Sequence, residues 1–383
     1  MAVVVVQPAA GQAPTAVRRV LAAAGLASRT LPPADDAGPS DGLTGVEGLI
    51  VLGAAAPALL QEALAAEVPV LALEPGTRLL VREPDAAPGV RPGTAPDRPP
   101  VELTRAAGSD PLFAGATPPS PGLRPACDPL ELPAGAVVLA SCDGYPDQAF
   151  RIGPSAWGVR FLPHDLPLDP WGEQLLGRFA RLVADRATHT ATRAFFTRRA
   201  DAWEERFAYQ TPAYDAAVAR LRLAPGARAV DLGCGTGRAM PALRAQVGTG
   251  GQVVGVDLTP AMLTAAARHG RTRHGSLLAA DCTRLPLAAA SVDGIFSAGL
   301  LDHLPEPAAA LREWARVTAA DGVLLLFHPS GRAERAARHG RPLDPGDLLA
   351  EGNLRRALEA TGWHLEEYED AAGHFLARAL PRR

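Results

Sequence analysis

The stretch VDLGCGTGRAM, from Val230 to Met240, decides how the second half of the chain folds. Its first residues belong to a short apolar run that predicts a buried strand ending at Leu232. Gly233, Gly235 and Gly237 follow, and glycine tolerates positive φ and lets a ligand approach the backbone closely. A helix is expected to begin directly afterwards. This spacing suits a ligand pressed against the turn, although a lone G-x-G-x-G also fits a plain tight turn.

Two acidic residues favour the ligand site over the plain turn. Asp257 stands 20 residues past Gly237, at the expected end of the next strand. A carboxylate there can accept hydrogen bonds from both hydroxyls of a ribose. Asp281 stands at the expected end of the third strand, where it could meet an adenine amino group. We therefore predict a nucleoside-containing cofactor at the ends of three successive strands.

Strands and helices alternate through both halves of the chain. The second half contains seven apolar runs, the last two close enough for a hairpin: RAVDLGCG, QVVGVDL, SLLAAD, VDGIFSAG, GVLLLFHP, WHLEEYED and HFLARAL. The first half begins with AVVVV, GLIVLG and VPVLAL and continues, after a Pro/Gly-rich loop over residues 82–100, with GAVVLASCDG, QAFRIG and WGVRFLPHD. Short apolar strands separated by helices indicate parallel sheets covered on both faces. We predict an α/β protein of two doubly wound domains, residues 1–186 and 187–383.

Composition limits the partners and the chemistry. The 383 residues suffice for two cores, and a net charge of -3 gives no electrostatic reason to expect nucleic acid or a membrane surface. We expect a small-molecule substrate, with a homodimer as a further option. The sequence contains no lysine, which excludes a Schiff base and a phosphate-binding Gly-Lys-Ser/Thr loop. The four cysteines lack metal-ligand spacing, so we predict no metal site. A reducing bacterial cytoplasm fits best.

The second half resembles the class I S-adenosylmethionine-dependent methyltransferases. The resemblance rests on VDLGCGTG, GVDLTPAML, ADCTRLPL and the long stretch that begins SVDGIFSAGLLDHLPEP, in that order. It implies a Rossmann-like seven-stranded fold that binds S-adenosyl-L-methionine. It also implies that Asp231 faces the methionine amino group through solvent and that Asp257 binds the ribose hydroxyls. The other implied cofactor contacts are Gly233, Gly235, Gly237, Leu258, Met262, Asp281, Cys282, Ala298 and Gly299.

Few residues are suited to act as a general base. Asp302 and His303 follow the fourth strand, and His328 ends the fifth. Either histidine fits a structural hydrogen bond equally well, and Asp302 departs from the histidine common in related small-molecule enzymes. Downstream, Arg332, Arg335, Arg338 and Arg341 could hold an acidic acceptor but fit a solvated helix face better. Upstream, the aromatic residues of FFTRRADAWEERFAYQ could form a lid over the acceptor but more often indicate core packing.

The first half resembles a class I glutamine amidotransferase domain, which implies a flavodoxin-like fold. The segments VPVLALEPGTRLL, DPLFAG, QAFRIG and WGVRFLPHDL follow that family's order. Glu74 stands where the family has its cysteine nucleophile, and Leu162 and His164 stand in the places of the histidine and glutamate. Pro75 also lacks the backbone N–H that such an elbow uses as an oxyanion donor. We therefore expect a domain that is inactive as a glutaminase.

Two ways in which this first site could still have catalytic activity are less favoured than an inactive site. Cys127 and Cys142 do not lie at a strand-helix elbow, so neither is placed to replace the missing nucleophile. Glu74 and His164 could form a new acid-base pair, but a salt-bridged or solvated relic is the preferred interpretation.

The sequence thus predicts methyl transfer to O, N or C of a small molecule, in bacterial specialised metabolism, with the first domain binding substrate or mediating assembly. Two alternatives stay open. One is a regulator or scaffold that binds S-adenosylmethionine without transferring methyl, and the other is an enzyme in which the cofactor assists a non-methylating reaction.

Overall fold

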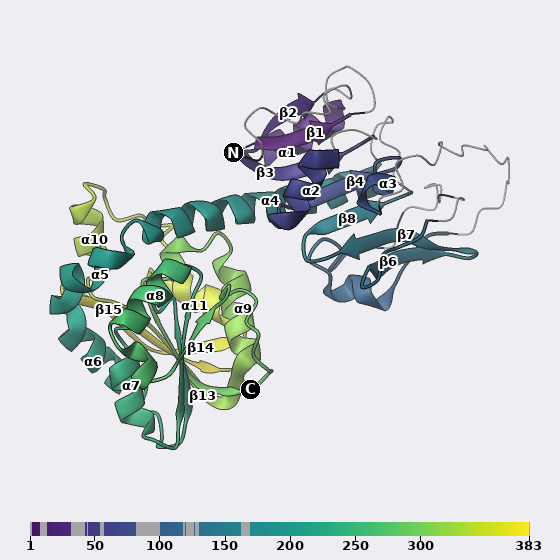
Figure 1. Ribbon diagram of the computed structural model, residues 1–383. Coiled ribbons are helices and arrows are strands. Elements are labelled where there is room, and N and C mark those ends of the chain that lie inside the picture. The colour runs from purple at the N-terminus through teal and green to yellow at the C-terminus, as the bar shows by residue number, and fades with distance from the viewer. Residues whose placement is uncertain are drawn as a thin grey trace. The chain divides into compact units, whose positions relative to one another are not determined.

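The computed structural model describes residues 2–7, 14–31, 43, 45–53, 57–81, 100–117, 119, 126, 130–161 and 169–382. The chain divides into two compact units, Met1–Thr188 and His189–Arg383. The division falls inside one continuous helix, α4 (Pro170–Thr197), which contributes residues to both units (Figure 1). The predicted bounds, residues 1–186 and 187–383, place the domain boundary inside the same helix.

The N-terminal unit is built on an eight-stranded mixed sheet of order β2-β1-β3-β4-β8-β7-β6-β5. The strands from β2 to β8 in this order run parallel, and β8, β7, β6 and β5 pair antiparallel. The elements are β1 (Ala2–Val6), α1 (Thr15–Ala23), β2 (Ala27–Leu31), β3 (Val46–Val51), α2 (Pro57–Ala65), β4 (Val70–Leu73), α3 (Thr77–Leu80), β5 (Glu102–Leu103), β6 (Val137–Cys142), β7 (Tyr145–Ile152) and β8 (Ala156–Val159).

Apolar side chains alternate between the two faces of this sheet. Val3 and Val5 of β1 pack with α1 and with the first half of α4, whereas Val4 and Val6 pack with α2 and α3. Both faces are therefore covered, as predicted for a doubly wound unit. The sequence missed β2, because most of its side chains are exposed and polar, and it missed the two-residue β5. The predicted loop over 82–100 lies almost entirely outside the described residues.

The C-terminal unit contains the seven predicted strands in the order β11-β10-β9-β12-β13-β15-β14. All neighbours are parallel except β15, which runs antiparallel to both β13 and β14. The elements after α4 are α5 (Ala200–Phe207), α6 (Thr211–Ala219), β9 (Arg228–Leu232), α7 (Met240–Val247), β10 (Gln252–Asp257), α8 (Pro260–Arg268), β11 (Ser276–Ala279), β12 (Val292–Ala298), α9 (Pro307–Val317), β13 (Thr318–His328), α10 (Arg332–Arg338), α11 (Glu351–Glu359), β14 (Trp363–Ala371) and β15 (His374–Pro381).

Two hydrophobic clusters cover the faces of this sheet. Leu325 and Phe327 of β13 pack with α6 and α7, whereas Leu324 and Leu326 pack with α9 and α11. The order of the strands changes direction at β9, and ligands of open α/β sheets bind at the carboxyl ends of the strands beside such a point. The fold therefore places the glycine turn after β9 where a ligand is expected.

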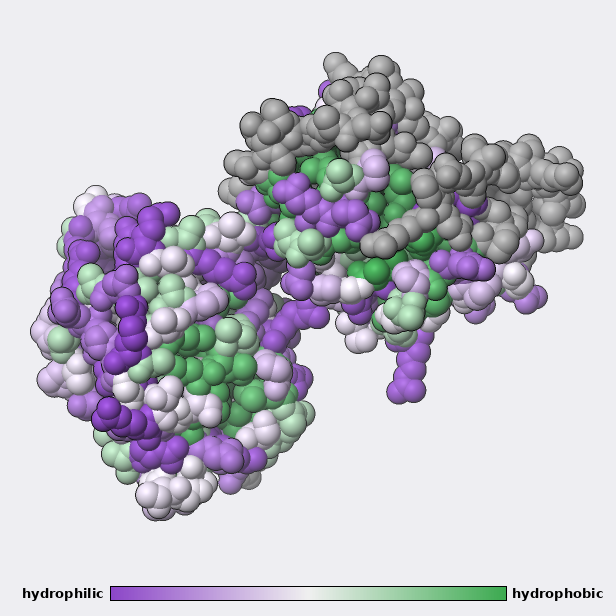
Figure 2. Space-filling view, in the orientation of Figure 1, coloured by the Kyte–Doolittle hydropathy of each residue, from purple (hydrophilic) through white to green (hydrophobic). Residues whose placement is uncertain are grey.

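The surface of the C-terminal unit is mixed in character. On the face shown in Figure 2, hydrophilic residues surround a central group of apolar ones. Among the described residues, no helix is both long enough and apolar enough to cross a membrane.

Candidate functional site

The glycine turn after β9 adopts the conformation that its sequence predicts. Gly233, Gly235 and Gly237 all have positive φ, at 68°, 54° and 73°. Space is restricted at two of them as well, since a Cβ on Gly237 would lie 2.9 Å from Cγ of Arg271, and one on Gly233 would lie 3.0 Å from Cδ1 of Leu300. The turn therefore requires glycine both for its backbone angles and for its packing.

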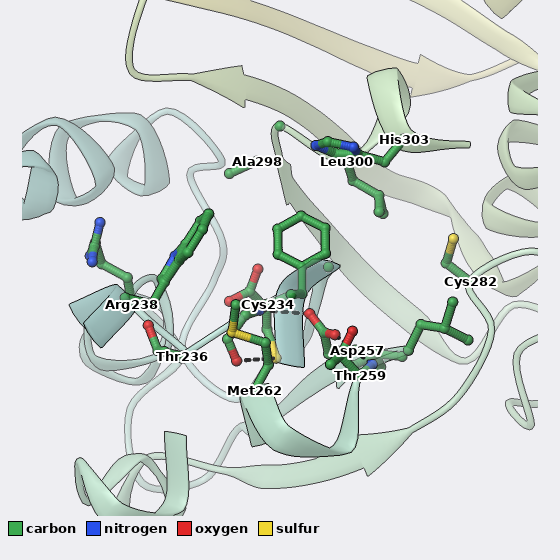
Figure 3. Close-up of a pocket in the computed structure, with 18 of the residues that line it drawn as sticks. Cys234, Thr236, Arg238, Asp257, Thr259, Met262, Cys282, Ala298, Leu300 and His303 are labelled. Atoms are coloured by element: carbon green, nitrogen blue, oxygen red, sulfur yellow. Dashed lines mark hydrogen bonds between the residues drawn. The ribbon is translucent and has the colours of Figure 1, made fainter. Parts of the chain in front are cut away.

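A cavity of about 310 Å³ opens at the carboxyl ends of β9, β10 and β12. In the view of Figure 3, Asp257 and Thr259 lie across it from Leu300 and His303. Most of the predicted site residues line this cavity: Asp231, Gly233, Gly235, Asp257, Leu258, Met262, Asp281, Cys282, Ala298, Gly299, His303 and His328. Gly237 and Asp302 do not. Every lining residue belongs to the C-terminal unit.

The carboxylate of Asp257, at the end of β10, binds the backbone of the glycine turn after β9 and of the turn after β10. One carboxylate oxygen accepts the backbone N–H of Gly235 at 2.9 Å, and the other accepts that of Thr259 at 2.8 Å. Burial raises the pKa of Asp257, although these hydrogen bonds oppose the shift. The carboxylate is therefore fixed in place at the cavity wall, with remaining lone pairs for a ligand.

Among the described residues, no cation forms an ion pair with Asp231, near the end of β9. The residue is only 2% exposed, and burial together with the nearby charge of Asp257 raises its pKa to about 8. A cationic group placed in the cavity would stabilise the ionised form and lower this pKa again. The geometry thus prepares Asp231 for a positively charged ligand group such as an ammonium.

Asp281 and Cys282 form another part of the cavity wall after β11. Asp281 accepts hydrogen bonds from the backbone N–H and the hydroxyl of Thr283, both at 2.8 Å, and lies 3.8 Å from Nδ1 of His189 on α4. Burial raises the pKa of the Cys282 thiol to about 12, so the thiol is neutral. The backbone carbonyl of Cys282 is held by the indole N–H of Trp314 at 3.0 Å.

The three catalytic candidates have different surroundings. His328 and His303 line the cavity, and burial lowers the pKa of both, that of His328 to about 4 with a contribution from Arg335. Nδ1 of His328 lies 3.0 Å from the carbonyl oxygen of Ser330. Asp302 instead forms an ion pair with Arg335. Both histidines are therefore neutral near pH 7, and Asp302 does not line the cavity.

The aromatic and arginine clusters divide between the cavity and the surface. Phe196, Trp203 and Phe207 line the cavity, whereas Phe195 and Tyr209 are exposed. Of the four arginines after β13, Arg338 alone lines it, and its guanidinium pairs with Glu334 at 2.7 Å. Arg332 and Arg335 are paired with carboxylates, and Arg341 is exposed.

Sequence reasoning missed part of the wall, which comes from two helices that precede β9 and from the glycine turn itself. His189 and Thr192 of α4 and Tyr214 of α6 line the cavity, as do Thr236 and Arg238 of the glycine turn. A signal existed for the aromatic residues in their helical spacing, but spacing alone does not distinguish a cavity wall from a core. For His189 and Thr192 the sequence carries no such signal.

The corner after β4 in the N-terminal unit carries ion pairs. Glu74 accepts a hydrogen bond from the hydroxyl of Thr77, and its carboxylate lies 3.5 Å from Nε of Arg78 and 3.6 Å from Nε of Arg160. Arg160 is 3% exposed and donates to Asp147 at 2.5 Å. Glu74 is thus salt-bridged. Leu162, His164 and Cys127 lie outside the described residues.

Comparison with known proteins gives a consistent result for the C-terminal half. A family model described as a methyltransferase domain matches residues 230–326. A demethylmenaquinone methyltransferase from Mycobacterium sp. (strain KMS) is 30% identical over 184 residues, which cover 42% of this chain and 77% of the relative. The chain belongs to the S-adenosylmethionine-dependent methyltransferase family.

Two further similarities concern the same family. A malonyl-[acyl-carrier protein] O-methyltransferase from Laribacter hongkongensis is 37% identical over 146 residues, which cover 35% of this chain. The chain spans about half the length of that relative, 48%. A solved magnesium protoporphyrin IX methyltransferase from Synechocystis, with bound SAH, is 20% identical with a TM-score of 0.41, covering 51% of this chain and all of that one.

The residues of the methyltransferase unit fit the cofactor of this family. The glycine turn permits close approach, and Asp257 is held at the end of β10. Buried Asp231 has no ion-pair partner within the part of the chain that the structure describes. S-adenosylmethionine offers a ribose and an ammonium to match the two acids. Among the described residues, no group of three or more His, Cys, Asp and Glu side chains could hold a metal ion.

Proposed function

We propose that the C-terminal unit binds S-adenosyl-L-methionine and transfers its methyl group to a small-molecule acceptor. The observation that carries this proposal is the convergence of three strand ends on one cavity, where Asp231, Asp257 and Asp281 meet the glycine turn. Each acid has a different environment, which suits three different parts of one ligand. A plain tight turn after β9 would explain none of these acids.

The cavity residues are assigned to parts of the cofactor in line with their environments. Asp257 would accept hydrogen bonds from the ribose hydroxyls while it holds Gly235 and Thr259. Asp231 would ionise against the methionine ammonium, since that charge offsets its burial. Asp281 and Cys282 would meet the adenine edge, with Leu258 and Met262 on its faces.

The bound cofactor supplies an electrophilic methyl group on a sulfonium centre. The chain then has to hold the acceptor atom in line with that group and exclude water. Phe196, Trp203 and Phe207 supply an apolar wall for this purpose, and Ala298 and Gly299 line the cavity at the end of β12. Most of the catalytic effect would therefore come from orientation.

The histidines can assist an acceptor that must lose a proton. Nδ1 of His328 lies 3.0 Å from the carbonyl oxygen of Ser330 and 3.1 Å from its backbone nitrogen. In the tautomer that donates to the carbonyl, His328 would keep a lone pair on Nε2. His303 packs edge-on against Phe196, with ring centres 5.3 Å apart. Relatives named as O-methyltransferases support an oxygen acceptor. Arg338 adds a positive charge at the cavity wall, which favours an acceptor that carries an acidic group.

We further propose that the N-terminal unit is an amidotransferase-like domain without glutaminase activity. The parallel part of its mixed sheet and its strand-turn-helix corner support the fold. Its inactivity is supported by Glu74, whose carboxylate is engaged by Arg78 and Arg160 at the place of the nucleophile. The unit would then contribute to acceptor binding or to assembly, for example as a homodimer.

Labelled cofactor tests the methyltransferase proposal. The full chain is incubated with S-adenosylmethionine carrying a deuterated methyl group and with small-molecule extract of the source organism, and products are analysed by mass spectrometry. The proposal expects a product that gains the label together with S-adenosylhomocysteine. Cofactor binding without S-adenosylhomocysteine would instead indicate a regulator, and product without cofactor consumption a non-methylating enzyme. Release of glutamate from glutamine would contradict the assignment of the N-terminal unit.

A further inference from the structure

Glu204 on α5 joins three side chains that surround the glycine turn. One of its carboxylate oxygens accepts the hydroxyl of Thr236 at 2.6 Å and the guanidinium of Arg238 at 3.2 Å. The other oxygen accepts Nη2 of Arg271 at 2.7 Å. We call these four residues the Glu204 cluster. Glu204 does not itself line the cavity, and no part of the cofactor assignment above uses it.

The Glu204 cluster is shielded from solvent and depends on its one carboxylate. The side chains of Glu204, Arg238 and Arg271 are 15%, 5% and 17% exposed. Burial alone would raise the pKa of Glu204, but the Thr236 hydroxyl and the two arginines outweigh it and hold the pKa below its usual value. Without this carboxylate, two nearly buried arginines would lie beside each other with less compensation.

The Glu204 cluster contacts the glycine turn after β9, which is called the cofactor turn below. Thr236 lies between Gly235 and Gly237, the two residues with positive φ, and its backbone carbonyl also accepts Nε of Arg271 at 3.3 Å. The side chain of Arg271 covers Gly237 so closely that no Cβ would fit there. The carboxylate of Glu204, on α5, thus holds the turn from outside the cavity.

Helix α5 also carries part of the apolar wall that is proposed to face the acceptor, called the aromatic wall below. Trp203 and Phe207 of α5 both line the cavity, and their rings pack at a tilt of 54° with centres 4.7 Å apart. The indole nitrogen of Trp203 lies 4.0 Å from the position of a Cβ on Gly235. Any shift of α5 would therefore move the aromatic wall relative to the cofactor turn.

We propose that Glu204 is a positioning residue that couples the cofactor turn to α5, so that cofactor binding orders the aromatic wall for the acceptor. This inference rests on the proposed function, because it requires cofactor in the cavity. Glu204 acts through Thr236, Arg238 and Arg271 and touches neither reactant. The cofactor turn and the aromatic wall are thereby ordered together.

Hydrogen exchange of residues 200–207 tests the coupling directly. Exchange is measured in the full wild-type chain and in Glu204→Gln, each with and without S-adenosylhomocysteine. The ligand is added at about 100 times the Kd of the protein under test. At this concentration, full coupling would slow exchange up to about 100-fold. We expect the ligand to slow exchange in α5 at least about tenfold in the wild type, and less than about twofold in Glu204→Gln. Residues 230–240 should be protected in both.

Asp201→Asn is the matched control on the same helix. The side chain of Asp201 is 85% exposed and pairs with Arg268 at the surface, so its loss should leave the protection of α5 unchanged. If Glu204→Gln does not fold, Thr236→Val removes one contact of the cluster and should reduce the protection of α5, whereas Thr236→Ser should restore it. Wild-type protection of α5 in Glu204→Gln or Thr236→Val would overturn the inference. Failure of the wild type to bind S-adenosylhomocysteine would instead overturn the proposed function on which it rests.

Discussion

Both units have an acidic residue near the carboxyl end of a buried parallel strand, and the two acids differ in what neutralises them. Glu74, after β4, is paired with Arg78 and Arg160. Asp231, near the end of β9, lines a cavity and is destabilised in its ionised form by burial and by Asp257. We infer that an acid at the end of a strand is suited to bind a ligand when no cation of the protein neutralises its charge. A corner whose charge is matched from within the protein becomes structural.

The largest expected effect comes from Asp231→Asn. The raised pKa of Asp231 means that the folded, ligand-free protein holds a proton that the unfolded chain has lost, so its stability falls as pH rises from about 4 to about 8. Asn cannot ionise. We expect the variant to be more stable than the wild type at pH 8, by a few kcal/mol, and equal to it near pH 4.

Denaturant unfolding of the ligand-free C-terminal unit at both pH values measures this difference. Asp321→Asn, an exposed acid on β13, is the control and should show no such gain. The same Asp231→Asn variant should bind S-adenosylmethionine more weakly, because it lacks the charge that meets the ammonium. A variant whose stability follows the wild-type pH profile would show that Asp231 is already compensated, as Glu74 is.

Gly235→Ala should have an intermediate effect, on stability and on binding. Alanine at this φ of 54° costs about 1 kcal/mol, and the same strain arises in Gly226→Ala, where φ is 88° and nothing lies within 4 Å of the added Cβ. Only the methyl at position 235 enters the cavity. We expect calorimetry to give about tenfold weaker binding of S-adenosylhomocysteine for Gly235→Ala, which is about 1.4 kcal/mol. Equal affinities in the two variants would place the ligand away from the turn.

Glu74→Gln should have the smallest effect on function. It removes one charge from the ion pairs with Arg78 and Arg160, which should destabilise the N-terminal unit by about 1–3 kcal/mol. Glu173→Gln, in the exposed pair with Arg19, should cost less than about 1 kcal/mol. Methyl transfer should not change in either variant. A loss of methyl transfer in Glu74→Gln, with folding intact, would give the first corner a role in the reaction.

The sequence predicted the core of the methyltransferase site because that part is local. The glycine turn and Asp257 follow their strands directly, so spacing alone brings them to one sheet edge. The wall formed by α4, α5 and α6 could not be predicted in the same way. His189 and Trp203 reach the cavity only through the packing of helices, and their spacing does not say which face meets the cofactor.

Boundaries and exposed strands were the weaker part of the fold prediction. The polar composition after Arg186 suggested a break, whereas α4 continues to Thr197. Strand β2 was not predicted, because three of its five side chains are exposed and its sequence therefore lacks the alternating apolar pattern of a strand. At the first corner, the sequence placed an acid, Glu74, directly after the strand but did not indicate the buried arginines that pair with it.

Calorimetric titration of the full chain with S-adenosylmethionine tests the central claim most directly. The account predicts one site per chain in the wild type and in the exposed-acid control Asp321→Ala. It predicts affinity at least about 100-fold lower in Asp257→Ala, because two hydrogen bonds from ribose hydroxyls to a charged group are lost. Absence of binding in the wild type, or unchanged affinity in Asp257→Ala, would contradict it.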